Sequence, residues 1–223
     1  MSTLLKTRDL VKTYGTGEAA TRVLRGLSLR LEAGEMAALL GPSGAGQSTL
    51  LTILGTLLKP TSGQYEMLSQ DMIAADARAL TEFRNAHIGF VFQFHNLLPD
   101  FTALENVIFP AAVRAGRETP AARKLGRVLL ARMGLAERID FPTANLSGGQ
   151  KQRVAVARAL MNAPDLVLAD KPTGNLDRAS AMQVMDLIGE INREEGTTFL
   201  ISTHDEKIAA RCRRQVGVRD GIV

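Results

Sequence analysis

A glycine-rich turn between an apolar run and the start of a helix constrains this chain more than any other stretch. The run from Met36 to Leu40 is typical of a buried strand, and Gly41, Gly44 and Gly46 follow it. Glycine lets a backbone bend and approach a ligand without Cβ clashes, so that successive N–H groups can surround an anion. The helix that begins near Ser48 adds the positive end of its dipole. The turn therefore predicts a phosphate cradle.

The turn follows the P-loop pattern G-x-x-x-x-G-K-[ST] at every position but one. It reads GPSGAGQST, and Gln47 stands where the pattern has lysine. An ordinary glycine turn is the alternative interpretation, so the prediction depends on motifs elsewhere in the chain. The residues that we expect to contact phosphate are Gly41, Pro42, Ser43, Gly44, Ala45, Gly46, Gln47, Ser48 and Thr49.

Length and composition favour one α/β core in a chain that works inside a reducing compartment. A chain of 223 residues suffices for one such core with a smaller subdomain. Its longest nearly apolar run, Thr49 to Leu58, is far shorter than the roughly 20 residues that span a bilayer. The first residues alternate polar and apolar side chains, so we expect no secretory signal there. Cys212 is the only cysteine, which excludes an internal disulfide, and we expect it to be a structural thiol beside Arg211 and Arg213.

Charge and aromatic content argue against nucleic acid as a ligand. The net charge is +4, but the basic residues form no block. Aromatic residues make up 4% of the chain, which leaves few platforms on which bases could stack. We therefore expect no nucleic-acid partner.

Strand and helix patterns alternate along the chain. Leu4–Val11 and Val23–Leu31 alternate apolar and polar residues, which predicts a small antiparallel sheet. Further apolar strands and amphipathic helices then alternate, which indicates a mainly parallel sheet with ligands at the carboxyl ends of its strands. Residues 94–142 are helical in character, with Pro99, Pro110 and Pro120 expected as breaks. The predicted strands of the second half are Leu166–Ala169 and Thr197–Ser202.

Several motifs occur in a fixed order that is specific in combination. They are Tyr14, the P-loop Gly41–Thr49, Gln93, LSGGQ at Leu146–Gln150, LVLAD at Leu166–Asp170, GNLD at Gly174–Asp177, and His204. With these motifs the chain resembles the ATP-binding-cassette (ABC) family over essentially its whole length.

The resemblance implies a fold with three parts. These are a P-loop NTPase core with a mainly parallel sheet, an N-terminal antiparallel β subdomain and an inserted helical subdomain. It implies a single ATP-binding domain over residues 1–223, with the core and β subdomain in 1–92 and 155–223. The helical subdomain and the LSGGQ signature then occupy 93–154.

The resemblance also implies ATP and Mg²⁺ as cofactors and assigns a role to single residues. Ser48 and Asp170 offer the oxygen ligands that a small hard cation prefers. Gln93 presents an amide to the metal or to the attacking water, and His204 contacts the γ-phosphate. Tyr14 stacks on the adenine.

The signature motif implies that two cassettes are needed to enclose one nucleotide. Ser147, Gly148, Gly149 and Gln150 lie at a predicted helix N-terminus, where a hydroxyl and backbone amides form a second anion site. In the family this site closes over ATP bound to a partner cassette. We therefore expect a head-to-tail pair with a second copy of the chain, with Asp177 near the shared interface.

Within the family, the chain looks most like cassettes of the lipoprotein-release, macrolide-efflux and haem-efflux type. Such subunits couple ATP to a separate integral membrane permease with a large extracytoplasmic domain, usually in an exporter. The resemblance places the chain at the cytoplasmic face of the membrane, held there by the permease. Phe94 to Phe101 is the segment expected to receive a coupling helix of the permease.

Two departures from the family pattern predict impaired hydrolysis. Gln47 removes the cation that would neutralise phosphate charge, and Lys171 replaces the glutamate that acts as general base. Lys171 either restores charge near the γ-phosphate or pairs with Asp170 and disturbs the metal site. Three explanations account for the pattern: engineered substitutions that arrest the cycle, a naturally degenerate cassette with a structural or regulatory role, and an error in the recorded sequence. Because every other motif is intact, engineered substitution or an unusual natural variant is favoured.

Two other functions remain as alternatives. One is an inactive nucleotide-binding scaffold. The other is a soluble ABC protein of DNA repair or translation, which is disfavoured because those proteins usually carry tandem cassettes, coiled-coil insertions or zinc cysteines.

Overall fold

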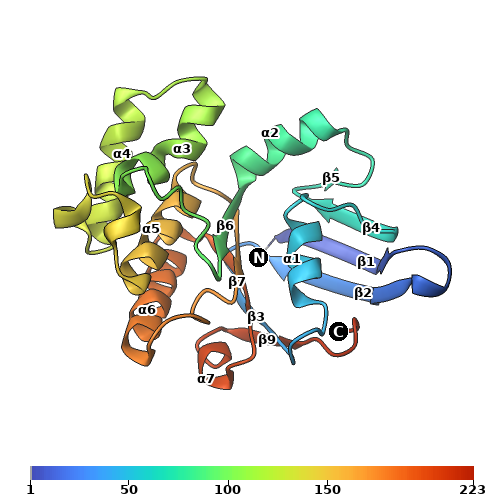
Figure 1. Ribbon diagram of the computed structural model, residues 1–223. Coiled ribbons are helices and arrows are strands. Elements are labelled where there is room, and N and C mark those ends of the chain that lie inside the picture. The colour runs from blue at the N-terminus through green and yellow to red at the C-terminus, as the bar shows by residue number, and fades with distance from the viewer. Residues whose placement is uncertain (1) are drawn as a thin grey trace.

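Two β-sheets and the helices around them form the fold in the computed structural model, which describes residues 2–223 (Figure 1). One sheet has the strand order β2-β1-β4-β5 and is antiparallel, and the other has the order β6-β7-β8-β3-β9 and is parallel. The strands are β1 (Thr3–Tyr14), β2 (Thr21–Glu32), β3 (Met36–Leu40), β4 (Ser62–Met67), β5 (Gln70–Asp71), β6 (Ile88–Phe92), β7 (Leu166–Asp170), β8 (Thr198–Thr203) and β9 (Arg214–Gly217). The helices are α1 (Gln47–Leu54), α2 (Ala77–His87), α3 (Ala103–Ala115), α4 (Pro120–Arg132), α5 (Gly148–Leu160), α6 (Arg178–Glu195) and α7 (Glu206–Ala209). Short 3₁₀ turns occupy Gly17–Ala19, Ala136–Arg138 and Thr143–Asn145.

The parallel sheet separates two hydrophobic cores because its side chains alternate between its faces. Ala38, Val167 and Ile201 face the core that contains α3 to α6, whereas Leu39 and Leu168 face the core that contains α1 and the antiparallel sheet. Helix α1 therefore lies between the two sheets (Figure 1). This arrangement fixes the position of the glycine turn that precedes α1.

The predicted α/β class, with its parallel core, antiparallel N-terminal sheet and helical segment, is confirmed. Strand β4 adds to the antiparallel sheet by pairing with β1, which the sequence did not indicate. Strand β9 and the short helix α7 were not expected either. Strand β9 is four residues long and lies at the edge of the parallel sheet, where it pairs with β3.

Helices α3, α4 and α5 pack on one another beside the parallel sheet (Figure 1). Pro120 begins α4 behind the N-cap Thr119, as expected. The expected break at Pro110 is wrong, because α3 continues through it. A capping box of Thr102 and Glu105 and a buried apolar face stabilise α3 despite the proline. None of the helices in residues 2–223 is both long and apolar enough to cross a bilayer.

The proposed boundary between helical subdomain and core falls inside a continuous helix. Helix α5 runs from Gly148 to Leu160 and packs against α3 and α4 as well as against β6. It thus belongs to both halves of the division at residue 154, and the division itself stays a prediction.

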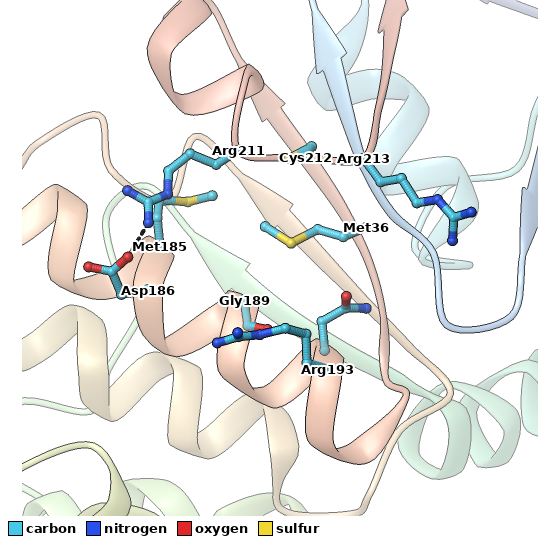
Figure 2. A pocket seen from close by; sticks show the side chains of 9 residues that line it. Met36, Met185, Asp186, Gly189, Arg193, Arg211, Cys212 and Arg213 are labelled. Atoms are coloured by element: carbon cyan, nitrogen blue, oxygen red, sulfur yellow. Dashed lines mark hydrogen bonds and ion pairs between the residues drawn. The ribbon is translucent and has the colours of Figure 1, made fainter.

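A cavity of about 390 Å³ lies between α6 and the segment that leads into β9 (Figure 2). Met36, Met185 and Cys212 line it, and Arg211 turns toward Asp186 on α6, with which it forms an ion pair. Cys212 is buried, and burial raises the pKa of its thiol to about 11. The thiol is therefore protonated at neutral pH, as befits a structural cysteine.

The raised pKa of Cys212 gives a direct test of this packing. A pKa about two units above the ordinary value lowers the thiolate fraction at pH 8 about 100-fold, so we expect iodoacetamide to label the folded chain at least about 100-fold more slowly than the urea-unfolded chain. The labelling rate of the folded chain should keep rising up to about pH 11, whereas that of the unfolded chain should level off above pH 9. Equal labelling rates for the folded and the unfolded chain at pH 8 would contradict the burial of the Cys212 thiol.

Candidate nucleotide site

The glycine turn has the geometry that close backbone approach requires. Gly44 and Gly46 have φ angles of 85° and 98°, in the left-handed region that favours glycine. A Cβ at Gly41 would lie 2.1 Å from the carbonyl oxygen of Val218, so no other residue fits there. Gly46 is the N-cap of α1, which places the first amides of the helix at the turn. The turn at the carboxyl end of β3 thus has the backbone geometry that the predicted phosphate cradle requires, and phosphate binding there stays a prediction.

The side chain of Gln47 lies in the protein interior, with 4% of its surface exposed. Its Nε2 donates to the carbonyl oxygens of Leu39 (2.7 Å) and Thr203 (3.2 Å). Both amide hydrogens are therefore used to join α1 to the ends of β3 and β8. The neighbouring Ser48 is exposed. Gln47 thus acts as a brace of the sheet where the P-loop pattern has a lysine.

Asp170 and Ser48 come together as the resemblance implies. Both line a small cavity of about 20 Å³ between α1 and the ends of β6 and β7. Asp170 Oδ1 accepts a hydrogen bond of 2.6 Å from the Ser202 hydroxyl, which orients the carboxylate. A hydroxyl and an oriented carboxylate are the hard oxygen ligands that suit Mg²⁺. These residues therefore fit the metal that the family uses.

Lys171 directly follows β7 in an unusual backbone conformation. Its φ angle is 45°, which costs a non-glycine residue about 1–3 kcal/mol. The backbone of Ser202 and its hydroxyl hold it there, because Lys171 N–H donates to Ser202 Oγ (3.0 Å) and to Ser202 O (3.2 Å). In residues 2–223 no ion pair within 4.0 Å joins Lys171 to Asp170, and the two alternatives for the Lys171 ammonium group stay predictions.

Gln93 directly follows β6, but its amide faces a partner that the sequence did not indicate. Gln93 Nε2 donates to Asn175 Oδ1 (3.1 Å), and Asn175 Nδ2 donates to the carbonyl oxygen of Gln93 (3.2 Å). Gln93 is not among the residues that line the cavity shared by Ser48 and Asp170. The expected contact of Gln93 with the metal or the attacking water stays a prediction.

The signature motif forms the N-terminus of α5. Ser147 is the N-cap, and its hydroxyl accepts from Gln150 N–H (3.3 Å) while Gln150 Oε1 accepts from Ser147 N–H (2.9 Å). The amides of Gly148 and Gly149 donate no hydrogen bond to any residue in 2–223. This end of α5 can therefore receive an anion from outside the chain.

Asp177 lies beside the signature and caps the next helix. The Ser180 hydroxyl donates to Asp177 Oδ2 (2.6 Å) and the Ser180 amide to Oδ1 (3.0 Å), and these bonds lower the pKa of the exposed carboxyl. A Cβ at Gly149 would lie 2.9 Å from Ser180 Oγ, so the starts of α5 and α6 are in contact. In the single chain Asp177 is thus a helix cap, and its expected place near a dimer interface stays a prediction.

Tyr14 and His204 complete the expected set. Tyr14 ends β1 with 43% of its surface exposed, and Lys12 Nζ lies 5.2 Å from its ring centroid. Its hairpin reaches the glycine turn, because a Cβ at Gly46 would lie 3.2 Å from Val23 O on β2. His204 directly follows β8 and is exposed. Both side chains are exposed, and their contact with a nucleotide stays a prediction.

Sequence reasoning missed three residues that shape this site. Ser202 faces Asp170 in the β7–β8 register, a pairing that a strand alignment could have suggested. Asn175 belongs to the GNLD motif but was not singled out. Arg158 on α5 donates to the carbonyl oxygens of His95 and Asn96, and no local pattern signals this role. Its burial lowers the pKa of the guanidinium.

A family model described as "ABC transporter" matches residues 24–174. The chain belongs to the ABC transporter family. Related ABC proteins include the "Lipoprotein-releasing system ATP-binding protein LolD 2" of Rhodospirillum rubrum, which is 60% identical over 98% of this chain and 94% of that protein. The protein "Lipoprotein-releasing system ATP-binding protein LolD 1" of Caulobacter vibrioides is 56% identical over 99% of this chain and 94% of that protein.

Solved ABC structures agree with the fold. The cassette MJ0796, described as a dimer in a post-hydrolysis state bound to ADP and Pi, superposes with a TM-score of 0.91. It is 38% identical, and the match covers 99% of this chain and 96% of that one. ATP and Mg²⁺ are the ligands of ABC cassettes, and the cradle, Ser48 and Asp170 of this chain are suited to them.

The brace formed by Gln47 can be tested by unfolding. Gln47→Leu keeps the volume of the side chain but leaves two carbonyl groups at the sheet edge without their donor. We expect the free energy of unfolding, measured in urea, to fall by about 1–3 kcal/mol. Gln64→Leu, at an exposed glutamine on β4, is the matched control and should change it by less than about 0.5 kcal/mol. An equally small change for Gln47→Leu would show that the brace does not stabilise the fold.

Proposed function

We propose that this chain is the ATP-binding, energy-coupling subunit of an ABC exporter of the lipoprotein-release type. The observation that carries the proposal is the phosphate cradle at the end of β3, with Ser48 and Asp170 lining one cavity beside it. The identity with two LolD proteins over nearly the whole chain supports the transport class. The transported molecule is chosen by the permease.

Binding would depend on groups that the fold already orients. The amides of the turn between Gly41 and Gly46 would surround the phosphates, and Tyr14 would stack on the base. Ser48 and Asp170 would hold Mg²⁺, which neutralises phosphate charge when bound. His204, at the end of β8, would contact the γ-phosphate.

ATP would close two cassettes on each other. The free amides of Gly148 and Gly149 and the hydroxyl of Ser147 would contact the nucleotide of a partner cassette, with Gln150 supporting the helix start. Asp177 would lie near the shared interface. The dimeric state of MJ0796 supports this arrangement, and a second copy of the chain is the proposed partner.

Hydrolysis would be severely impaired. The Gln47 amide is occupied by backbone carbonyls, so the cradle has no cation at that position. Lys171 stands where the family has a general base, and an ammonium group accepts no proton from water at neutral pH. An inactive nucleotide-binding scaffold is the second candidate, and these two residues favour it over a soluble ABC protein of another pathway.

The rate of ATP hydrolysis distinguishes an ATP-hydrolysing transporter subunit from an inactive nucleotide-binding scaffold. In the transporter reconstituted with its permease, we expect the unaltered chain to hydrolyse ATP at least about 100-fold more slowly than the Gln47→Lys, Lys171→Glu double variant. Phosphate release is the measurement, and each single variant serves as a control. Hydrolysis by the unaltered chain at the rate of the double variant would refute the impairment.

An apolar groove is the proposed contact with the permease. It has a volume of about 390 Å³ and lies between the α2–β6 region and α3. Leu57 and Phe109 are exposed at the groove, and Asn96 of the Phe94–Phe101 segment lines it. A coupling helix of the permease would insert there, which places the chain at the cytoplasmic face of the membrane. The proposed permease carries a large extracytoplasmic domain.

The groove can be tested by charge insertion. Phe109→Asp puts a carboxylate among apolar groove residues, so we expect at least a tenfold loss of the permease that co-purifies with the chain from membranes, by analogy with the cost of losing an aromatic contact. Val128→Asp on α4, where valine is 56% exposed outside the groove, is the matched control and should keep the permease bound. Equal losses for the two variants would contradict this placement.

A further inference from the structure

The last two residues of β8 support both of the proposed metal ligands. Thr203 O accepts a hydrogen bond from Gln47 Nε2 (3.2 Å), and Gln47 directly precedes Ser48 at the start of α1. Ser202 Oγ donates to Asp170 Oδ1 (2.6 Å) at the end of β7. Adjacent residues of one strand therefore hold the two sides of the small cavity that Ser48 and Asp170 line.

The hydrogen bonds of the Ser202 hydroxyl have fixed directions. Lys171 N–H lies 3.0 Å from Ser202 Oγ, and because an amide nitrogen only donates, the hydroxyl oxygen accepts there. The hydroxyl has a single hydrogen, and it gives that hydrogen to Asp170 Oδ1. Ser202 has none of its surface exposed, so water does not compete for these bonds.

The bond from Ser202 decides which oxygen of Asp170 remains available. A carboxylate turns about a torsion with broad preferences, so it needs a partner to fix its plane. Within residues 2–223, the Ser202 hydroxyl is the one group that forms a hydrogen bond or an ion pair with the Asp170 side chain. Asp170 Oδ1 is thus occupied, whereas Oδ2 is left for a ligand from outside the chain.

We propose that Ser202 is a positioning residue for Mg²⁺, whose hydroxyl holds Asp170 so that Oδ2 is offered to the metal. The inference rests on the proposed function, in which Ser48 and Asp170 hold Mg²⁺. Loss of a group that orients a metal ligand typically costs about 10- to 100-fold in metal affinity. Ser202 therefore sets how strongly Mg²⁺ improves the binding of ATP.

The test compares two substitutions that differ in one hydroxyl. Ser202→Val and Ser202→Thr add nearly the same volume to β8, but only threonine keeps the hydroxyl that Asp170 and Lys171 use. The Kd for ATP is measured with Mg²⁺ and with EDTA. Ser202→Val should weaken the Kd with Mg²⁺ at least about tenfold and leave the Kd in EDTA unchanged. Ser202→Thr should keep both Kd values, and equal losses for the two variants would overturn the inference.

Two further variants separate the hydroxyl from side-chain volume and from stability. Ser202→Ala removes the hydroxyl without adding volume and should reproduce the Mg²⁺-specific loss of Ser202→Val. Thr7→Val removes another buried hydroxyl, one that bonds to Leu29 in the antiparallel sheet and does not line the cavity, and should leave both Kd values unchanged. A merely structural role of Ser202 would weaken binding with Mg²⁺ and with EDTA alike, which would also overturn the inference.

A second background keeps this inference distinct from the proposed function. The series is measured in the unaltered chain and in a Gln47→Lys background, which restores the cation of the P-loop pattern. Binding of ATP with the same Mg²⁺ dependence in Ser202→Val as in its parent chain overturns this inference alone. No binding of ATP in either background overturns the proposed function, and the inference with it.

Discussion

The burial of helix α1 between two sheets is the constraint on which the nucleotide site depends. Leu50 and Leu54 are fully buried in a core that also contains the antiparallel sheet and one face of the parallel sheet. Burying such side chains stabilises the fold by about 1.5–3 kcal/mol each. The glycine turn is thereby fixed between β3 and α1.

The pattern of apolar residues along the sequence predicted the strands whose burial is regular along their length. Strands β1 and β2 were predicted because side chains on opposite faces of a strand alternate in sequence, so that burial of one face gives alternating apolar residues. Strands β3 and β7 were predicted because burial of both faces gives a continuous apolar run. The place of β4, the existence of β9 and the continuation of α3 through Pro110 were not. These features depend on pairing and packing with residues distant in sequence, which no short window contains.

In the candidate site, the sequence predicted the positions of residues but not the directions of their side chains. Motif spacing predicted which residues lie at the strand ends, and the structure brings Ser48 and Asp170 to one cavity. It did not predict that Gln47 donates into the sheet or that Gln93 faces Asn175. A motif fixes a position on the backbone, whereas the direction of a flexible amide is decided by whichever acceptors the tertiary fold supplies.

The backbone at Lys171 is held in place without help from its own side chain. Its left-handed conformation is held by hydrogen bonds from its own amide to Ser202, and the lysine side chain takes no part in them. The path of the chain after β7 therefore depends on Ser202 and not on the side chain at residue 171. A substitution at this position exchanges the chemical group offered at the sheet edge while the bonds that hold the backbone remain.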